Sequence, residues 1–221
     1  MKLITYIKYF YFLYTNWDFN IAWQIIKQEI KGEREYKINT CGADELINLE
    51  ELGIDISHAA IYMPVSYSLL KEIFKQLPLT ERNHFLDIGC GMGRALCIAA
   101  HQGYKQISGL DLSKNLCDIA KQNLTKTQEQ IASFQFTIIN NDAFYYKIPP
   151  NVDCIFLFNP FDEIIMSGVI NNIFESLQNN PRKIKIIYAN PLYKDQFLKA
   201  GYSQIWQSKK MEYIEAVILE N

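Results

Sequence analysis

Three glycines at alternate positions form the clearest chemical signal in the sequence, the run GCGMG at residues 89–93. The run follows a short apolar stretch, 84–88, and precedes a stretch with a helical pattern, 94–101. Glycine tolerates positive φ and lets a ligand approach the bare backbone. The first turn of a helix offers unpaired N–H groups and a partial positive charge. This combination is typical of a nucleotide-binding loop.

Two carboxylates accompany the glycine loop. Asp87 lies at the end of the preceding strand, where its charge would repel a pyrophosphate but favour a ligand that carries an ammonium group. Asp87 could also fix the loop by accepting hydrogen bonds from backbone N–H groups, and we expect both roles. Asp111 ends the next expected strand, about 20 residues past the glycines, where an acidic side chain can accept both hydroxyls of a ribose.

The spacing separates this loop from two other phosphate-binding loops. The dinucleotide fingerprint is G-x-G-x-x-G, and Arg94 stands where that fingerprint has its last glycine. The Lys and Ser/Thr of a P-loop do not follow the glycines. Arg94 would lie in the first turn of a helix, an unusual place for a cation given the helix dipole. It could neutralise a nearby carboxylate, contact the ligand, or simply lie at the surface.

Short apolar runs alternate with helical patterns from about residue 66 onward, which is typical of a parallel sheet covered on both faces. The five runs are residues 84–89, 106–112, 134–142, 152–159 and 183–190. Two further runs, 202–208 and 211–220, predict an antiparallel hairpin that turns at Lys209-Lys210, although this is not a favoured turn pair. The prediction is therefore a doubly wound α/β fold. Its seven-stranded sheet is mostly parallel and ends in an antiparallel hairpin.

Four motifs in order resemble those of the class I S-adenosylmethionine-dependent methyltransferases. They are FLDIGCGMG (85–93), GLDLS (109–113), NNDAF (140–144) and FNPF (158–161). The resemblance covers roughly residues 66–220 and implies S-adenosyl-L-methionine as the cofactor, with Asp142 and Ala143 beside the adenine. The cofactor-binding residues that we expect are Asp87, Gly89, Cys90, Gly91, Gly93, Asp111, Leu112, Asp142, Ala143 and Asn159.

The triplet Asn159-Pro160-Phe161 is the expected catalytic segment, although a proline after a strand is also ordinary strand termination. It resembles the [ND]-P-P-[YF] motif of methyltransferases that act on exocyclic amines and glutamine amides. In that motif, oxygens of the chain accept the hydrogens of the amine and the aromatic ring stacks on a planar group. The second proline is missing here, which puts planar amines in doubt. The resemblance implies transfer to an amino nitrogen of a protein side chain or a small molecule.

The segment IYMPVSYSLL (61–70) resembles the gateway of lysine methyltransferases. Either Tyr62 or Tyr67 could lie over the cofactor there, or serve only in packing. We assign no general base, since the three histidines, His58, His84 and His101, have the sequence context of surface or packing residues. Cys90 is expected to fill the loop compactly rather than to act as a nucleophile.

Residues 1–60 are expected to form a helical extension or cap, and residues 61–221 the cofactor-binding domain. Apolar residues between 4 and 30 recur at helical spacing and predict a helix that packs on the core or forms a lid. They are Tyr6, Phe10, Leu13, Trp17, Ile21 and Ile25. A helix that lies on a membrane surface is the less favoured alternative.

Composition restricts the remaining possibilities. The 221 residues carry a net charge of −2, which gives no electrostatic reason to expect a nucleic-acid partner. The five cysteines form no CxxC pair, so we expect no zinc site and a reducing, cytoplasmic environment. The expected ends of strands four and five carry Asn159 and Asn190, which argues against a hard-cation site. A non-catalytic module that binds the cofactor and, less favoured, an NAD-linked oxidoreductase remain as alternatives.

Overall fold

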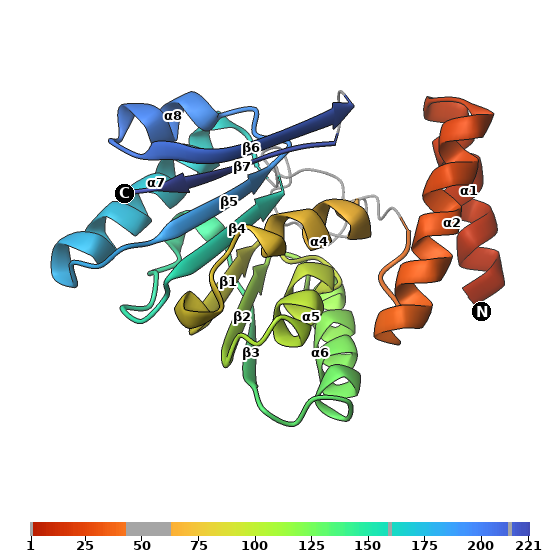
Figure 1. Ribbon diagram of the computed structural model, residues 1–221, viewed down its shortest axis with the longest axis horizontal. Helices are drawn as coiled ribbons and strands as arrows, with labels where there is room; N and C mark the ends of the chain where they lie inside the picture. Colours follow the sequence, from red (N-terminus) through yellow and green to blue (C-terminus); the bar gives the residue numbers. More distant parts are fainter. Residues whose placement is uncertain (1, 43–62, 159–160, 212–213) are drawn as a thin grey trace.

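The computed structural model describes residues 2–42, 63–158, 161–211 and 214–221. These residues form a seven-stranded sheet in the order β3-β2-β1-β4-β5-β7-β6, with helices on both faces (Figure 1). The strands are β1 (His84–Ile88), β2 (Gln106–Asp111), β3 (Gln135–Asn140), β4 (Cys154–Phe158), β5 (Lys185–Ala189), β6 (Ser203–Met211) and β7 (Ile214–Glu220). Strands β1 to β5 pair in parallel, whereas β7 runs antiparallel to both β5 and β6. The predicted fold class is confirmed.

The predicted turn of the terminal hairpin is wrong. Lys209 and Lys210 lie inside β6, and the two strands are joined at residues 212–213, outside the described residues. Lys209 pairs with Glu215 across the hairpin, and its Nζ lies 3.4 Å from a carboxylate oxygen of that residue. Because lysine does not favour the positive φ of a tight hairpin turn, Lys209 and Lys210 are better accommodated in the extended strand.

Helices cover both faces of the sheet, and successive side chains of each strand point alternately to one helical layer and to the other. Helices α4 (Tyr67–Lys75), α5 (Arg94–His101) and α6 (Lys114–Gln128) pack on one face, the face that Phe85 of β1 contacts. Helices α7 (Glu163–Asn179) and α8 (Lys194–Lys199) and the 3-10 turn η2 (Ala143–Tyr145) pack on the other, where Leu86 points. A second 3-10 turn, η1 (Leu79–Glu81), precedes β1. Burial on both faces explains why the parallel strands are apolar almost throughout.

The amino-terminal region contains two helices where one was predicted. Helix α1 (Lys2–Asn16) ends before Asp18, and α2 (Phe19–Tyr36) begins after it. The Asp18 backbone is extended, with φ −143°, and its carboxylate accepts a hydrogen bond from the N–H of Ile21 at 2.9 Å. This N-cap starts a new helix, and the two helices pack on each other through Leu13 and Ala22. The apolar spacing runs through the break because each helix turns its apolar stripe toward the other.

Figure 1 shows α1 and α2 side by side, beyond the edge of the sheet at which β4 and β5 end. The predicted boundary between residues 60 and 61 lies outside the described residues. None of the described helices is both long enough and apolar enough to cross a membrane.

Candidate functional site

The glycine loop lies at the carboxyl edge of the sheet, between the end of β1 and the start of α5. Its three glycines, Gly89, Gly91 and Gly93, have φ values of 82°, 53° and 80°, which side chains rarely tolerate. A Cβ on Gly93 would lie 3.0 Å from the Cβ of Ala120 in α6. The N–H groups of Gly89 and Cys90 both donate to the carbonyl of Leu110, at 2.8 and 2.9 Å, which fastens the loop to the end of β2.

Asp111 fixes the loop from the neighbouring strand. Its carboxylate accepts hydrogen bonds from the N–H of Gly91 at 2.7 Å and from the N–H of Ser113 at 2.9 Å. Ser113, not Asp111, caps α6, since the Ser113 hydroxyl accepts from the N–H of Leu116 at 3.3 Å. Asp111 therefore has the loop-fixing role that we had expected of Asp87.

Asp87 is buried, with 3% of its surface exposed, and lies where β1 pairs with both β2 and β4. No donor among the described residues bonds to its carboxylate, so the prediction that Asp87 fixes the loop is wrong. Burial, and then the charge of Asp111, raise the pKa of the Asp87 carboxyl well above its ordinary value. Two acidic groups thus share one site, and a cationic ligand would relieve their unfavourable energy.

The expected adenine residues lie at the end of β3. The Asp142 carboxylate accepts a hydrogen bond from the N–H of Phe144 at 2.8 Å and so starts η2, whereas Ala143 is buried. Asn140, which was not among the expected site residues, joins the ends of β3 and β2. Its amide donates to the carbonyls of Asp111 at 3.0 Å and of Leu112 at 2.6 Å.

The catalytic segment is described only in part. Asn159 and Pro160 lie outside the described residues. Phe161 is half-buried and packs against the core cluster beneath α7, and Asp162 caps that helix through the N–H of Ile164 at 3.0 Å. Strand β4 ends at Phe158, beside β1. The order of the strands reverses between β1 and β4, and such a switch point is where open α/β sheets bind their ligands.

Tyr67 is a packing residue. It is buried, its ring stacks on Tyr36 with 5.8 Å between ring centres, and the Arg94 guanidinium lies 4.1 Å from its ring centre. Tyr62 lies outside the described residues.

The surface interpretation of Arg94 is wrong. Only 2% of Arg94 is exposed, and it forms an ion pair with Glu29 of α2, so the interpretation that it neutralises a carboxylate is confirmed. The sequence contains one signal for this ion pair: a cation in the first turn of a helix is opposed by the helix dipole, and so indicates a compensating carboxylate nearby.

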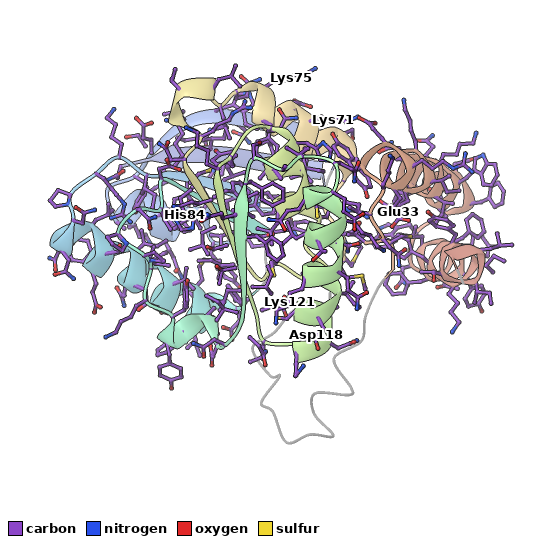
Figure 2. The ribbon with its side chains drawn as sticks, turned by 90° about the horizontal axis from the view of Figure 1, so that it is seen from below. Glu33, Lys71, Lys75, His84, Asp118 and Lys121 are labelled. Carbon is purple, nitrogen blue, oxygen red and sulfur yellow. The ribbon has the colours of Figure 1, made fainter. Side chains whose placement is uncertain are left out.

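The other reactive side chains lie away from the loop or are inert. His84 opens β1 at the opposite edge of the sheet, where its Nε2 lies 2.8 Å from the Ser108 hydroxyl (Figure 2). His101 ends α5, with its ring centre 4.9 Å from that of Tyr36. Burial lowers the pKa of both imidazoles, and His58 lies outside the described residues. Cys90 is buried and burial raises the pKa of its thiol well above the ordinary value, which agrees with a role in filling the loop.

Comparison with known proteins links this site to methyl transfer. Residues 85–180 match the family model described as "Methyltransferase domain". A proposed protein N5-glutamine methyltransferase of Methanocaldococcus jannaschii is 28% identical over 169 residues, which cover 74% of this chain and 79% of that protein.

The similarity to solved structures concerns the fold. A proposed methylase of Haemophilus influenzae has a TM-score of 0.53 at 21% identity, covering 70% of this chain and 97% of that one. The ribosomal protein L11 methylase of Lactobacillus delbrueckii subsp. bulgaricus has a TM-score of 0.51 at 11% identity, covering 68% and 76%. The segment that matches the family model, 85–180, contains the glycine loop, Asp111, Asp142 and the end of β4.

Proposed function

We propose that this chain, a class I S-adenosylmethionine-dependent methyltransferase, binds its cofactor across the ends of β1, β2 and β3 and methylates an amino nitrogen. The acceptor would be a protein side chain or a small molecule that reaches the end of β4. The side-chain amide of glutamine is the first acceptor to test, because the relative from Methanocaldococcus jannaschii is described as a proposed protein N5-glutamine methyltransferase.

The observation that carries the proposal is the buried carboxylate of Asp87 beside Asp111, to which no donor in the described part of the chain bonds. S-adenosylmethionine brings an ammonium group, whose charge would compensate Asp87 in a site from which water is largely excluded. A carboxylate offers about four lone-pair directions, so the bonds of Asp111 to Gly91 and Ser113 are compatible with further bonds to a ribose. The first turn of α5 would attract the carboxylate of the cofactor's methionine moiety.

The chain's residues would act on the reaction mainly by holding the two reactants in line. When bound, S-adenosylmethionine supplies a methyl group on a positively charged sulfur, activated for attack by a nitrogen lone pair. Asp87, Asp111 and the loop N–H groups would fix the position of this methyl group. Asn159 and the aromatic ring of Phe161 would orient the acceptor nitrogen, as their resemblance to the [ND]-P-P-[YF] motif implies.

Calorimetric titration with S-adenosylmethionine, S-adenosylhomocysteine and NAD tests cofactor choice. We expect the first two to bind and NAD not to bind; binding of NAD alone would overturn the proposal. Incubation with radiolabelled S-adenosylmethionine, a glutamine-containing peptide and a lysine-containing peptide then tests the acceptor. Label in the glutamine peptide supports an amide acceptor, and label in the lysine peptide an amine.

Asp111→Ala tests the cofactor site within the chain. Loss of charged hydrogen bonds to a ribose should weaken binding of S-adenosylhomocysteine by about 1.5–3 kcal/mol. Calorimetry measures this change. Lys105→Ala is the control. Lys105 is exposed and directly precedes the first residue of β2, at the end of the strand away from Asp111, so we expect wild-type affinity. Unchanged affinity in Asp111→Ala would show that Asp111 does not contact the cofactor.

A further inference from the structure

Arg94 connects the glycine loop to the amino-terminal helices. It is the first residue of α5, directly after the loop, and its guanidinium group reaches α2 instead of solvent. Its Nη1 donates to Oε1 of Glu29 at 2.8 Å, and its Nη2 donates to Oε2 of the same carboxylate. This two-pronged contact is the geometry for which the planar arginine fork is suited.

Arg94 also donates to Thr40, which follows α2, and to Val65, which precedes α4. Nε donates to the hydroxyl of Thr40 at 2.8 Å, and Nη1 also donates to the carbonyl of Val65 at 2.8 Å. Because these partners converge on one guanidinium, the first turn of α5 is fixed relative to α2 and to the segment that follows α2.

A second residue fastens the loop to the same segment. The amide of Asn123 in α6 donates to the carbonyl of Met92, in the middle of the loop, at 2.9 Å and to the carbonyl of Asn39 at 3.0 Å. Its oxygen accepts from the N–H of Asn39 at 2.9 Å. The glycine loop is therefore bound to residues 39–40 both through Asn123 and through Arg94.

Glu33 fixes this segment to α2 in turn. Its carboxylate accepts from the N–H of Thr40 at 2.6 Å and of Cys41 at 2.7 Å, and from the hydroxyl of Tyr6 in α1 at 2.5 Å. Figure 2 shows Glu33 between the amino-terminal helices and the body of the molecule. The contacts thus form a continuous chain from α1, through α2 and residues 39–41, to the loop.

A buried ion pair is a poor means of stabilising a fold, because the cost of removing two charges from water offsets their attraction. Here the cation also stands in the first turn of α5, where the helix dipole opposes it. Glu29 compensates both effects and directs Arg94 toward α2. An apolar pair would pack there without this directional constraint.

We propose that Glu29 and Arg94 are positioning residues of the cofactor loop, so that helix α2 sets the orientation of the loop N–H groups. The proposal rests on the proposed function, since it assigns the loop to S-adenosylmethionine. Neither residue needs to contact the cofactor; the effect passes from α2 through the first turn of α5.

Glu29→Gln tests this role in the full chain, because it keeps the shape of the side chain and removes its charge. We expect S-adenosylhomocysteine to bind at least tenfold more weakly, measured by calorimetry well below the melting temperature. Glu35→Gln is the matched control on the same helix. It removes an exposed ion pair with Lys71 of α4, at 2.6 Å, beside α2 (Figure 2), and should leave the affinity within twofold of wild type.

Glycine-selective 15N labelling reads the loop directly, since the chain has only 10 glycines. In the unliganded protein, Glu29→Gln should shift the N–H signals of Gly91 and Gly93 and leave Gly103 and Gly201 unchanged. Glu35→Gln should shift none of the four. A purely structural loss at α2 would not move the loop signals selectively.

If Glu29→Gln fails to fold, the double variant Glu29→Met with Arg94→Met tests the same role. The double variant removes both buried charges together and so leaves neither one unpaired. A folded double variant should still bind weakly and show shifted Gly91 and Gly93 signals. Wild-type affinity with unshifted signals in either folded variant overturns the positioning role. Failure of the wild type to bind S-adenosylhomocysteine would instead overturn the proposed function, and the glycine signals would still decide the role of the pair.

Discussion

At the scale of single residues, a buried negative charge on Asp87 is expected to destabilise the unliganded protein. The residue is buried beside Asp111, and no described donor compensates its carboxylate. Residues of this kind are expected where binding of a ligand supplies the missing interaction. The same side chain would then oppose folding in the free protein and favour binding in the complex.

Asp87→Asn should therefore stabilise the unliganded protein and weaken binding of S-adenosylhomocysteine. The pKa of Asp87 is raised in the folded state, whereas the unfolded chain ionises near its ordinary value of about 3.9. The contribution of Asp87 to stability consequently falls as the pH rises above that value, through the raised folded pKa. We expect the variant to gain about 0.5–2 kcal/mol at neutral pH.

Urea denaturation at several pH values measures this gain. The advantage of the variant should disappear as the pH falls below about 3.9, where the wild-type carboxyl becomes protonated in the unfolded state as well as in the folded state. If Asp87→Asn were less stable than wild type at neutral pH, the buried charge of Asp87 would not destabilise the unliganded protein.

At the scale of elements, helix α2 packs against α4 through a glycine. A Cβ on Gly32 would lie 2.3 Å from a ring carbon of Tyr67, so only glycine allows this approach. The close packing places Tyr67 against Tyr36 and Arg94, and it keeps Glu29 within reach of α5. The contact between α2 and α4 thus determines where the Arg94 side chain, directly after the glycine loop, can form its ion pair with Glu29.

Gly32→Ala should destabilise the protein, contrary to helix propensity. In an exposed helix the change would stabilise by about 1 kcal/mol, because alanine loses less backbone entropy. Here the clash with Tyr67 should dominate and cost about 1–3 kcal/mol. Urea denaturation gives the sign directly.

Lys31→Ala, at the adjacent exposed position of α2, is the control and should change stability by less than about 0.5 kcal/mol. A Gly32→Ala variant more stable than wild type would contradict the close contact between Gly32 of α2 and Tyr67 of α4.

At the scale of the whole molecule, the amino-terminal helices and the sheet should unfold as one unit. Polar contacts of Arg94 with Glu29 and of Asn123 with Asn39 cross between them, and Tyr36 and Ile38 belong to the same buried cluster as Phe85 of β1. Shared buried contacts make unfolding cooperative.

Thiol labelling across a urea titration tests this cooperativity. All five cysteines are free and buried, and burial raises the pKa of the Cys41 and Cys97 thiols, so the native protein should react slowly. Mass spectrometry should show that Cys41, beside the amino-terminal helices, and Cys97, in α5, become reactive in a single transition. Labelling of Cys41 at urea concentrations that still protect Cys97 would show that the amino-terminal region opens independently.

The sequence by itself determined the features that depend on neighbouring residues. Apolar runs of strand length between helical patterns predicted the parallel sheet, and glycines at alternate positions predicted the loop with positive φ. A serine directly before a helical pattern, such as Ser113 before α6, is likewise a local signal for the start of a helix. Asp18 offered a similar local signal, but the apolar spacing that continues past it concealed the break between α1 and α2.

Only the tertiary structure decided which distant polar groups meet. Glu29 and Arg94 are 65 positions apart, and Asn39 and Asn123 are 84 apart, so no local spacing relates them. Asp111 fixes the loop instead of Asp87 because the pairing of β1 with β2 places the end of β2 against the loop N–H groups. The sequence thus determined that a loop for a nucleotide-like ligand exists. Packing of helices and strands determined what holds the loop, because burial makes each charge and N–H group depend on whichever partner the fold brings within reach.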